Sequence, residues 1–446
     1  MGGGFAGTAL VLQLRQQPAL AGVEIHLIEP REVPGPGLAY SARRPEYLLN
    51  VRPGALSLYP EKPGHFTDWL TRQAENAGGV PEFASRAAYG HYLREELAPA
   101  LVPAAGAVQW HSTTAVAAPI LANGRRAVQL ADGTAIASDY MVLALGNFPP
   151  PPPAGPDLRY MHHPGFHADP WAAGNLRRIG PDEGVLLIGS GLTAVDVLLA
   201  LRQDGHRAPI TVVARHGRWP AAHAPATPPY PNFYSELARE ATVNGAVAAF
   251  KRQLRAAAAR GIGWQPVLDA LRPDLGRIWA LWPLAEQHRF LQHLAGLWAV
   301  ARHRSPPQNA AAVVALTAAG LVQMHVGTVR EIIPDGDLLR VRVGPHGAAG
   351  AWLVAQHVIN CAGPLLDYAR IAAPLVVSLR EAGDLTPDPL HLGLLTNAHG
   401  ALLADDGTAS PSLFTLGSSR RPAYFESTAV PELRLQAAAL AQHLAL

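Results

Sequence analysis

Two short stretches of the sequence have glycines at the spacing with which a backbone turn can approach a dinucleotide pyrophosphate. In the first stretch, Gly2, Gly4 and Gly7 form the pattern G-x-G-x-x-G around Phe5 and Ala6. The middle glycine leaves room for the pyrophosphate, and the helix that follows directs its N-terminal amides at the phosphate charge. All five residues are therefore candidate nucleotide contacts.

The second stretch, GVLLIGSGLTAVDVLLAL, has the complete pattern of a dinucleotide-binding unit. Residues 185–188 form an apolar run typical of a buried parallel strand, residues 192–202 have helical periodicity, and residues 210–215 form a second strand. The glycines lie in the turn between the first strand and the helix. The candidate nucleotide contacts in this unit are Gly189, Gly191, Leu192, Thr193 and Ala194.

The first unit has every part of this pattern except the leading strand. The helical segment TALVLQLRQQ follows its glycines, and the strand VEIHLIE ends in Glu29, 22 residues after Gly7 (29 − 7). An acidic residue at this position accepts hydrogen bonds from the hydroxyls of an adenosine ribose. Only one residue, Met1, precedes the turn, so the first strand of this unit is apparently missing.

Loss of that strand would be costly, because the first strand of such a sheet is central and buried on both faces. Five apolar residues at about 1.5–3 kcal/mol each contribute on the order of 10 kcal/mol, which is comparable to the whole stability of a domain. We expect that the native chain starts upstream of Met1. A real truncation with impaired nucleotide binding and another segment that fills the gap are the alternatives.

Composition indicates a folded, multidomain protein of 446 residues, with 49% apolar and 16% charged residues. A formal net charge of +2 gives no reason to expect nucleic acid or an anionic membrane as a partner. The N-terminus has no signal-peptide pattern, and no apolar run is long enough to span a bilayer. We expect a soluble cytoplasmic protein; its oligomeric state stays open.

Cysteine usage excludes dithiol redox chemistry, and the spacing of the histidines argues against a metal site. Cys361 is the only cysteine, so no redox-active dithiol can form, and its apolar strand context favours a buried structural thiol. The histidines at 162, 163 and 167 are not accompanied by a metal-binding motif. We therefore expect no metal site.

Two short strands followed by glycine, DYMVLALGN and HVINCAGP, divide the chain. The first is followed by a proline-rich linker at residues 148–156, and the segment from about 235 to 310 lacks strand alternation and is typical of a helical insertion. We predict an α/β fold with two Rossmann-like dinucleotide-binding domains. Residues 1–150 would form the first part of one domain, and residues 151–364, with the insertion, the other domain; that residues 365–446 complete the first domain is what the family resemblance given next implies.

The chain resembles the two-dinucleotide-binding-domain flavoproteins, which include flavin monooxygenases, and more narrowly an FAD/NAD(P)-binding protein family. The matching stretches are GGGFAGTAL, YLLNVRPGALSLYP, LALGN, DPWAAGNL, LLIGSGLTAVDVLLAL, ARHGRWPAAHAP, ARHRSPP, NCAGP and ESTAVPELRLQAAALA. They cover essentially the whole chain. The resemblance implies that the first unit binds FAD, that the second binds NAD(P)H, and that ALGN and NCAGP are the two crossings between domains.

The resemblance also assigns residues to the flavin. Gly2, Gly4 and Gly7 would contact the FAD pyrophosphate and Glu29 the ribose; the further flavin-side candidates are Asn50, Val51, Ser57, Gly146, Gly417 and Thr428. A helix that starts around Thr428 would direct its N-terminus at the flavin and stabilise negative charge there. The chain departs from the superfamily at Ser418, where an aspartate usually holds the ribityl chain, which puts that contact in doubt.

The choice of nicotinamide cofactor follows from charge. After the second strand of the second unit the sequence has Arg215 and Arg218 and no nearby acid. Arginine attracts a 2′-phosphate that a carboxylate would repel, so NADPH is favoured over NADH. A solvated loop is the alternative interpretation.

These features predict an FAD-dependent oxidoreductase that takes a hydride from NAD(P)H and passes electrons to oxygen or to an organic acceptor. With oxygen, the enzyme would be a monooxygenase acting on a nitrogen or next to a carbonyl. Asn50 and Glu426 are the candidate catalytic residues; a capped turn and a surface acid are the alternatives for them. The insertion is a candidate substrate cover, or plain core. A non-catalytic nucleotide sensor with impaired FAD binding is the alternative function.

Overall fold

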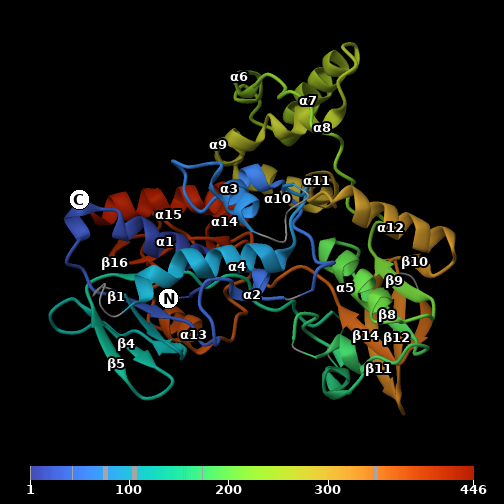
Figure 1. Cartoon of the computed structure of the whole chain (residues 1–446), viewed down its shortest axis with the longest axis horizontal. Coiled ribbons are helices and arrows are strands. Elements are labelled where there is room, and N and C mark those ends of the chain that lie inside the picture. Colours follow the sequence, from blue (N-terminus) through green and yellow to red (C-terminus); the bar gives the residue numbers. More distant parts are fainter. Residues whose placement is uncertain are drawn as a thin grey trace.

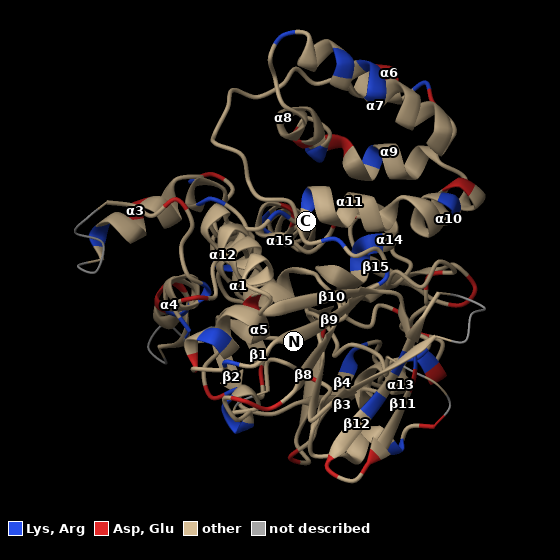
Figure 2. Cartoon of the chain, turned by 90° about the vertical axis from the view of Figure 1, so that its right-hand side faces the viewer, with Lys and Arg blue, Asp and Glu red and all other residues tan. Residues whose placement is uncertain are grey.

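The computed structural model describes residues 2–42, 44–73, 79–102, 108–153, 155, 157–172, 174–345 and 350–446. Two α/β units lie side by side, and part of the helical insertion stands above them (Figure 1). Lysines and arginines are interspersed with acidic residues over both units (Figure 2), as the small net charge of +2 suggests. No helix within the described ranges has the length and apolar character needed to cross a membrane.

The first unit contains two groups of parallel strands. In one group β1 (Ile25–Ile28) pairs with β2 (Val108–His111), and in the other β16 (Ala409–Thr415) pairs with β6 (Met141–Leu143) and with the antiparallel strand β15 (Ala401–Leu403). Strands that lie more than 250 residues apart in the sequence, β6 and β16, therefore share one sheet (409 − 143 = 266). An antiparallel sheet of β3 (Ala115–Ala117), β4 (Arg126–Leu130) and β5 (Ala135–Ser138) is attached.

Helices cover these strands and bring their apolar faces together. The helix after the first glycine turn, α1 (Phe5–Arg15), packs against the C-terminal helix α15 (Val430–Leu444) in one buried cluster. The other helices of this unit are α2 (Gly37–Tyr40), α3 (His65–Arg72), α4 (Arg86–Leu97), α13 (Pro374–Glu381) and α14 (Arg421–Tyr424). The predicted helix near Thr428 begins two residues later, at Val430.

The second unit is a five-stranded parallel sheet in the order β10-β9-β8-β14-β7. Its strands are β7 (Phe166–His167), β8 (Val185–Ile188), β9 (Ile210–Ala214), β10 (Val322–Val326) and β14 (His357–Asn360). The helix α5 (Leu192–Gln203) joins β8 to β9. A three-stranded antiparallel sheet of β11 (Thr328–Asp335), β12 (Leu338–Gly344) and β13 (Ala351–Ala355) packs beside it. The two Rossmann-like units of the sequence analysis are thus present.

The segment between β9 and β10 is helical. It contains α6 (Tyr234–Leu237), α7 (Val243–Ala258), α8 (Trp264–Asp269), α9 (Leu275–Leu281), α10 (Leu284–His293), α11 (Ala295–Arg302) and α12 (Pro307–Ala318). Trp279 and Trp282 are buried in the core of this segment with Phe290 and Phe425. Core packing, rather than an exposed substrate-facing wall, therefore accounts for these two tryptophans.

Two ion pairs join the first unit to helix α5 of the second unit. Arg86, at the start of α4, contacts Asp196 with Nη2 and Oδ2 3.0 Å apart, and Arg44 contacts Asp204 with both guanidinium nitrogens. Burial raises the pKa of Asp196 to about 6, against the opposing effect of Arg86. The Arg86–Asp196 pair thus places a charge inside the contact between the two units.

We expect Asp196→Asn to change the pH dependence of stability. The pKa of Asp196 is higher in the folded protein than its ordinary value of 3.8, so its favourable contribution is full below about pH 4 and is lost as the pH rises through about 6. Asparagine cannot titrate, and the stability of the variant relative to the native protein should therefore rise by about 2–3 kcal/mol between pH 4 and pH 7.

Urea unfolding at a series of pH values measures this difference. Asp204→Asn, which removes the more exposed pair with Arg44, is the matched control. It should lower the free energy of unfolding by at most about 1 kcal/mol. Parallel stability curves for the native protein and Asp196→Asn would contradict the assignment.

Candidate functional site

The first glycine turn is held between the ends of two strands. Gly2 has φ +85° and donates its amide to the carbonyl oxygen of Ile28 at 2.8 Å. A Cβ on Gly2 would lie 2.0 Å from the carbonyl oxygen of Ala144, and a Cβ on Gly7 would lie 1.9 Å from that of Gly2. Only glycine fits at these two positions, because any side chain would overlap the backbone.

The second glycine turn repeats this geometry. Gly189 has φ +102°, donates its amide to Val213 at 2.8 Å, and would place a Cβ 2.8 Å from the carbonyl oxygen of Cys361. Cys361 follows β14 directly rather than lying within it, and burial raises the pKa of its thiol. The thiol therefore packs as a small apolar group and is no nucleophile.

Both turns lead into helices whose N-termini are open. The N-cap residues Gly4 of α1 and Gly191 of α5 make no side-chain capping bond, and neither helix has an acidic residue in its first turn. The amides of the first turns carry the partial positive charge of the helix dipole. Two such ends suit the diphosphates of two nucleotides.

The two turns contribute to one shared cavity of about 320 Å³ between the units. Its lining from the first unit includes Gly4, Phe5, Ala6, Gly146, Gly417, Ser418 and Thr428, and its lining from the second unit includes Thr193 and the segment 362–364. The fold thus brings together eight residues that the sequence analysis singled out. They are Gly4, Phe5, Ala6, Gly146, Thr193, Gly417, Ser418 and Thr428. Cofactors that occupied both turns would therefore meet here.

Glu29, the predicted ribose contact, already has protein partners. It is buried, its Oε2 accepts the amide of Gly3 at 2.8 Å, and its Oε1 accepts the amide and the guanidinium of Arg31 at 3.1 and 2.9 Å. A carboxylate has lone pairs for further donors, so ribose binding stays a prediction. A cavity of about 420 Å³ beside it is lined by Arg31, His91 and Arg94, which the sequence analysis missed.

The residues that follow β16 are hydrogen-bonded to the first crossing, at Gly146, and to helix α15. Ser418 donates its hydroxyl to the carbonyl oxygen of Gly146, and the amide of Gly417 donates to Oε1 of Gln436 at 3.1 Å. This bond from Ser418 links the residues that follow β16 to the first crossing. Thr428 is exposed and lines the cavity just before α15 begins.

The predicted flavin-side wall lies apart from the shared cavity. Ser57 is fully buried, and its hydroxyl closes a turn with the backbone of Tyr59. Val51 packs against the core of the first unit. The carbonyl oxygen of Asn50 accepts a hydrogen bond from Nε2 of His223 at 2.9 Å. None of the three residues lines the shared cavity, and their flavin contacts stay predictions.

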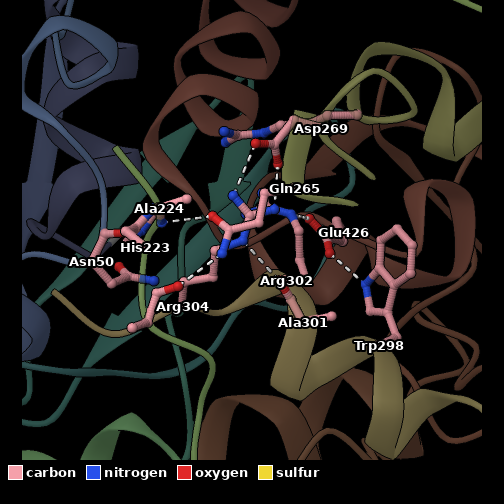
Figure 3. Close-up of polar contacts among 12 residues, drawn as sticks. Asn50, His223, Ala224, Gln265, Asp269, Trp298, Ala301, Arg302, Arg304 and Glu426 are labelled. Atoms are coloured by element: carbon pink, nitrogen blue, oxygen red, sulfur yellow. Dashed lines mark hydrogen bonds and ion pairs between the residues drawn. The ribbon is translucent and has the colours of Figure 1, made fainter. Parts of the chain in front are cut away.

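Asn50 and Glu426 take part in separate polar contacts at the base of the insertion (Figure 3). Glu426 accepts Nε1 of Trp298 at 2.7 Å and Nε of Arg302 at 2.9 Å, and both members of the ion pair are only 9% exposed at the side chain. Burial lowers the pKa of Arg302, and its Nη2 has no partner within the described part of the chain. Glu426 is therefore a buried ion-pair partner in this structure and not a surface acid.

The loop after β9 carries the predicted 2′-phosphate contacts. Arg215 and Arg218 are both exposed, and Ser190 in the second glycine turn donates its hydroxyl to the carbonyl oxygen of Arg218 at 2.6 Å. This bond fixes the loop against the turn. The two guanidinium groups thus remain accessible beside the second glycine turn. Each glycine turn, together with the start of the helix that follows it, is called a cradle below.

Within the part of the chain that the structure describes, no group of three or more His, Cys, Asp or Glu side chains is placed to hold a metal ion. Of the histidines that the sequence analysis considered, His167 bonds to His357 at 3.0 Å and His163 bonds to the carbonyl oxygen of Gly336 at 3.1 Å.

Comparison with known proteins agrees with this architecture. Residues 1–148 match the family model described as FAD-NAD(P)-binding. The sequence has no significant match among curated proteins.

Solved structures match over nearly the whole chain. The ornithine N-hydroxylase of Kutzneria sp. 744, solved with reduced FAD, NADP⁺ and L-ornithine, has a TM-score of 0.68 at 13% identity and covers 99% of this chain and 97% of its own. The L-lysine 6-monooxygenase of Pseudomonas syringae has a TM-score of 0.65 at 17% identity, with 99% and 97% covered. The thioredoxin reductase of T. acidophilum has a TM-score of 0.51 at 11% identity, with 100% and 95% covered.

The chain has the fold of the two-dinucleotide-binding-domain flavoproteins. Identities at this level establish the fold alone. In this fold, strands from residues 1–148 and from residues 401–415 form one unit around the first glycine turn, as the pairing of β6 with β16 shows.

Gly191→Val tests the second cradle of this flavoprotein fold. A Cβ on Gly191 meets no other atom within 4 Å, so the variant should fold, while the side chain occupies the space that a pyrophosphate needs. We expect the dissociation constant for NADPH to rise by about tenfold or more, which corresponds to about 1.4 kcal/mol. Isothermal titration calorimetry measures this dissociation constant.

Gly263→Val, at the similarly uncapped start of α8, is the matched control, because its Cβ also meets no atom within 4 Å. Equal NADPH affinity of the native protein and Gly191→Val would contradict the cradle.

Glu426→Ala separates a structural from a catalytic role. Removal of the carboxylate leaves Arg302 buried and unpaired, which should cost about 3–5 kcal/mol of unfolding free energy. Glu331→Ala, which breaks the exposed pair with Arg342, is the control and should cost at most about 1 kcal/mol. Urea denaturation measures both. A Glu426→Ala variant of native stability that no longer reduces its flavin would show a catalytic role instead.

Proposed function

We propose that the protein is an FAD-dependent oxidoreductase that takes a hydride from NAD(P)H, with NADPH favoured, and passes the electrons to oxygen or to an organic acceptor. The observation that carries this proposal is the shared cavity. Gly4, Phe5 and Ala6 line it from the first glycine turn, and Thr193 lines it from the second. Hydride transfer requires two nucleotides that approach each other, and this cavity is where they would meet.

The residues around the cavity fit the two coenzymes. The amides at the start of α1 would hold the FAD pyrophosphate, and those at the start of α5 would hold the pyrophosphate of the nicotinamide nucleotide. FAD, when bound, supplies the capacity to accept a hydride and to pass its electrons on. The N-terminus of α15 behind Thr428 would favour negative charge at the flavin end of the cavity.

The buried contact between the units would keep the two cradles in register. Asp196 of α5 is paired with Arg86, and Arg86 also lines the shared cavity. The pair therefore positions the second glycine helix, and its Arg86 forms part of the cavity wall.

Monooxygenation of a small molecule is the reaction class that the comparisons favour. Ornithine N-hydroxylase and L-lysine 6-monooxygenase share this fold over nearly their whole length. The insertion adds a cavity of about 430 Å³, lined by Arg52 of the first unit and by Tyr230, Asn232 and Asp269 of the insertion. These polar groups make it the candidate substrate cavity. We propose a small polar molecule as substrate.

A nucleotide-binding sensor without turnover is the second candidate. It is favoured by the contacts of Glu29, which already binds Gly3 and Arg31. Ser418, which stands in place of an aspartate, bonds to Gly146 and leaves the ribityl chain without its usual carboxylate partner. Such a protein would bind a nucleotide but would carry little FAD.

Anaerobic titration of the FAD-loaded protein distinguishes the two candidates. We expect NADPH to bleach the flavin absorbance and oxygen to restore it, and the double variant Arg215→Ser/Arg218→Ser to lose about tenfold or more in affinity for NADPH while its affinity for NADH is unchanged. Stopped-flow absorbance measures the rate of flavin reduction and the rate of reoxidation, and the dependence of the reduction rate on nucleotide concentration gives the affinity.

Arg207→Ser, which removes an exposed arginine paired with Asp182 on the same unit, is the matched control. A colourless protein that binds only an adenine nucleotide would support the sensor. Equal affinities of the native protein for NADPH and NADH would defeat the cofactor preference.

A further inference from the structure

Helix α11 of the insertion lies against the loop of residues 215–218, which carries the predicted 2′-phosphate contacts. A Cβ added to Gly296 would lie 3.2 Å from Cδ2 and Nε2 of His216, so no side chain stands between the helix and this imidazole ring. Just after the loop, the amide of Ala221 donates to the carbonyl oxygen of Val300 at 3.0 Å. The loop is therefore attached to α11 near both ends of the helix.

The same helix holds the segment of residues 417–428, which joins β16 to α15. Nε1 of Trp298 and Nε of Arg302 both donate to the carboxylate of Glu426, at 2.7 and 2.9 Å (Figure 3). The ring of Trp298 also lies 6.2 Å from the ring of Phe425, measured between centroids. Helix α11 thus contacts one loop from each of the two units.

The segment 417–428 reaches the shared cavity at both of its ends. Gly417 and Thr428 line the cavity. Ser427, which follows Glu426 directly, donates its hydroxyl to the carbonyl oxygen of Gly417. The Ser427 hydroxyl also accepts a hydrogen bond from Nε2 of Gln436 at 2.7 Å. A displacement of Glu426 would therefore reach both lining residues through Ser427.

The backbone of this segment is held in an unusual conformation by the insertion. Phe425 has φ +59°, in the left-handed region that bulky side chains rarely adopt. Its ring is buried in the core of the insertion and is stacked on the ring of Trp279, with centroids 4.8 Å apart. Such a conformation persists only where the surroundings fix it. The position of the insertion therefore decides the conformation of the segment.

A bound 2′-phosphate would act on the other side of α11. A phosphate monoester carries a charge of about −1.5 to −2 at neutral pH, and it draws guanidinium groups together in charge-assisted hydrogen bonds. Arg215 and Arg218 are exposed and free to close on such an anion. His216 lies between them in the sequence, so closure of the loop moves a ring that rests on Gly296.

We propose that α11 couples the two nucleotide sites: a 2′-phosphate bound by the loop 215–218 fixes α11, and α11 fixes the segment 417–428 through Trp298. Trp298 is a positioning residue, because it contacts Glu426 and does not line the shared cavity. This inference rests on the proposed function, since the 2′-phosphate is that of NADPH. The flavin end of the cavity would then be fixed in place by NADPH and not by NADH.

The test uses a nucleotide fragment that is too short to reach the flavin end of the cavity. Adenosine 2′,5′-bisphosphate carries the 2′-phosphate and lacks the nicotinamide half, and 5′-AMP lacks both. Hydrogen exchange of the amides of residues 417–428 is measured in the full chain supplied with FAD, without a fragment and with each fragment at saturation. The readout needs no electron transfer.

Trp298→Phe keeps an aromatic ring against Phe425 and removes only the donor to Glu426. Trp352→Phe is the matched control, because Trp352 lies on β13 and is 38% exposed. Both variants and the native protein are compared with and without the bisphosphate.

We expect the bisphosphate to slow exchange at residues 417–428 by about fivefold or more in the native protein, and 5′-AMP to leave it unchanged. Trp298→Phe should lose this slowing, while Trp352→Phe keeps it. Because coupling is reciprocal, Trp298→Phe should lose at most the same factor in affinity for the bisphosphate.

Three outcomes would overturn the inference: no slowing by the bisphosphate, equal slowing by 5′-AMP, or slowing that persists in Trp298→Phe. The native protein alone decides the first two, so the test does not depend on how well a variant folds. A flavin that NADPH bleaches, in a protein whose segment 417–428 does not respond, would leave the proposed function standing and overturn this inference alone. A bisphosphate that does not bind would contradict the proposed NADPH site and, with it, the coupling.

Discussion

Both glycine turns lie so close to the ends of neighbouring strands that no side chain could stand between them. The backbone of Gly2 abuts Ala144, and that of Gly189 abuts Cys361. This contact fixes where each following helix begins and therefore where its free amides point. The shared cavity, and with it the possibility of hydride transfer between two bound nucleotides, depends on these two contacts.

Charge placement complements this backbone geometry. The two helices that follow the glycine turns, α1 and α5, carry no acidic side chain in their first turns, while the buried Asp196 lies further along α5 and is neutralised by Arg86. An unpaired carboxylate at either helix start would oppose a bound phosphate. The base of the insertion follows the same rule, since the buried Glu426 and Arg302 lie against each other.

The sequence was sufficient for features that depend on local patterns. The strand at residues 185–188 and the helix that begins at Leu192 follow from apolar periodicity and glycine spacing, while the return of the last strand to the first unit was implied by the family resemblance. Contacts between distant residues could not be predicted in this way. Neither the engagement of Glu29 by Gly3 nor the pairing of Glu426 with Arg302, 124 positions away, leaves a local signal. Asn50 and Ser57 illustrate the same limit, because resemblance gave their region but not the direction of their side chains.

The central claim is that one chain holds an FAD and a nicotinamide nucleotide at the same time, in facing cradles. Native mass spectrometry of the full chain, supplied with FAD and NADP⁺, tests it most directly. The account predicts a complex that contains one of each coenzyme per chain. Binding of neither coenzyme, or binding of one only at the expense of the other, would contradict it.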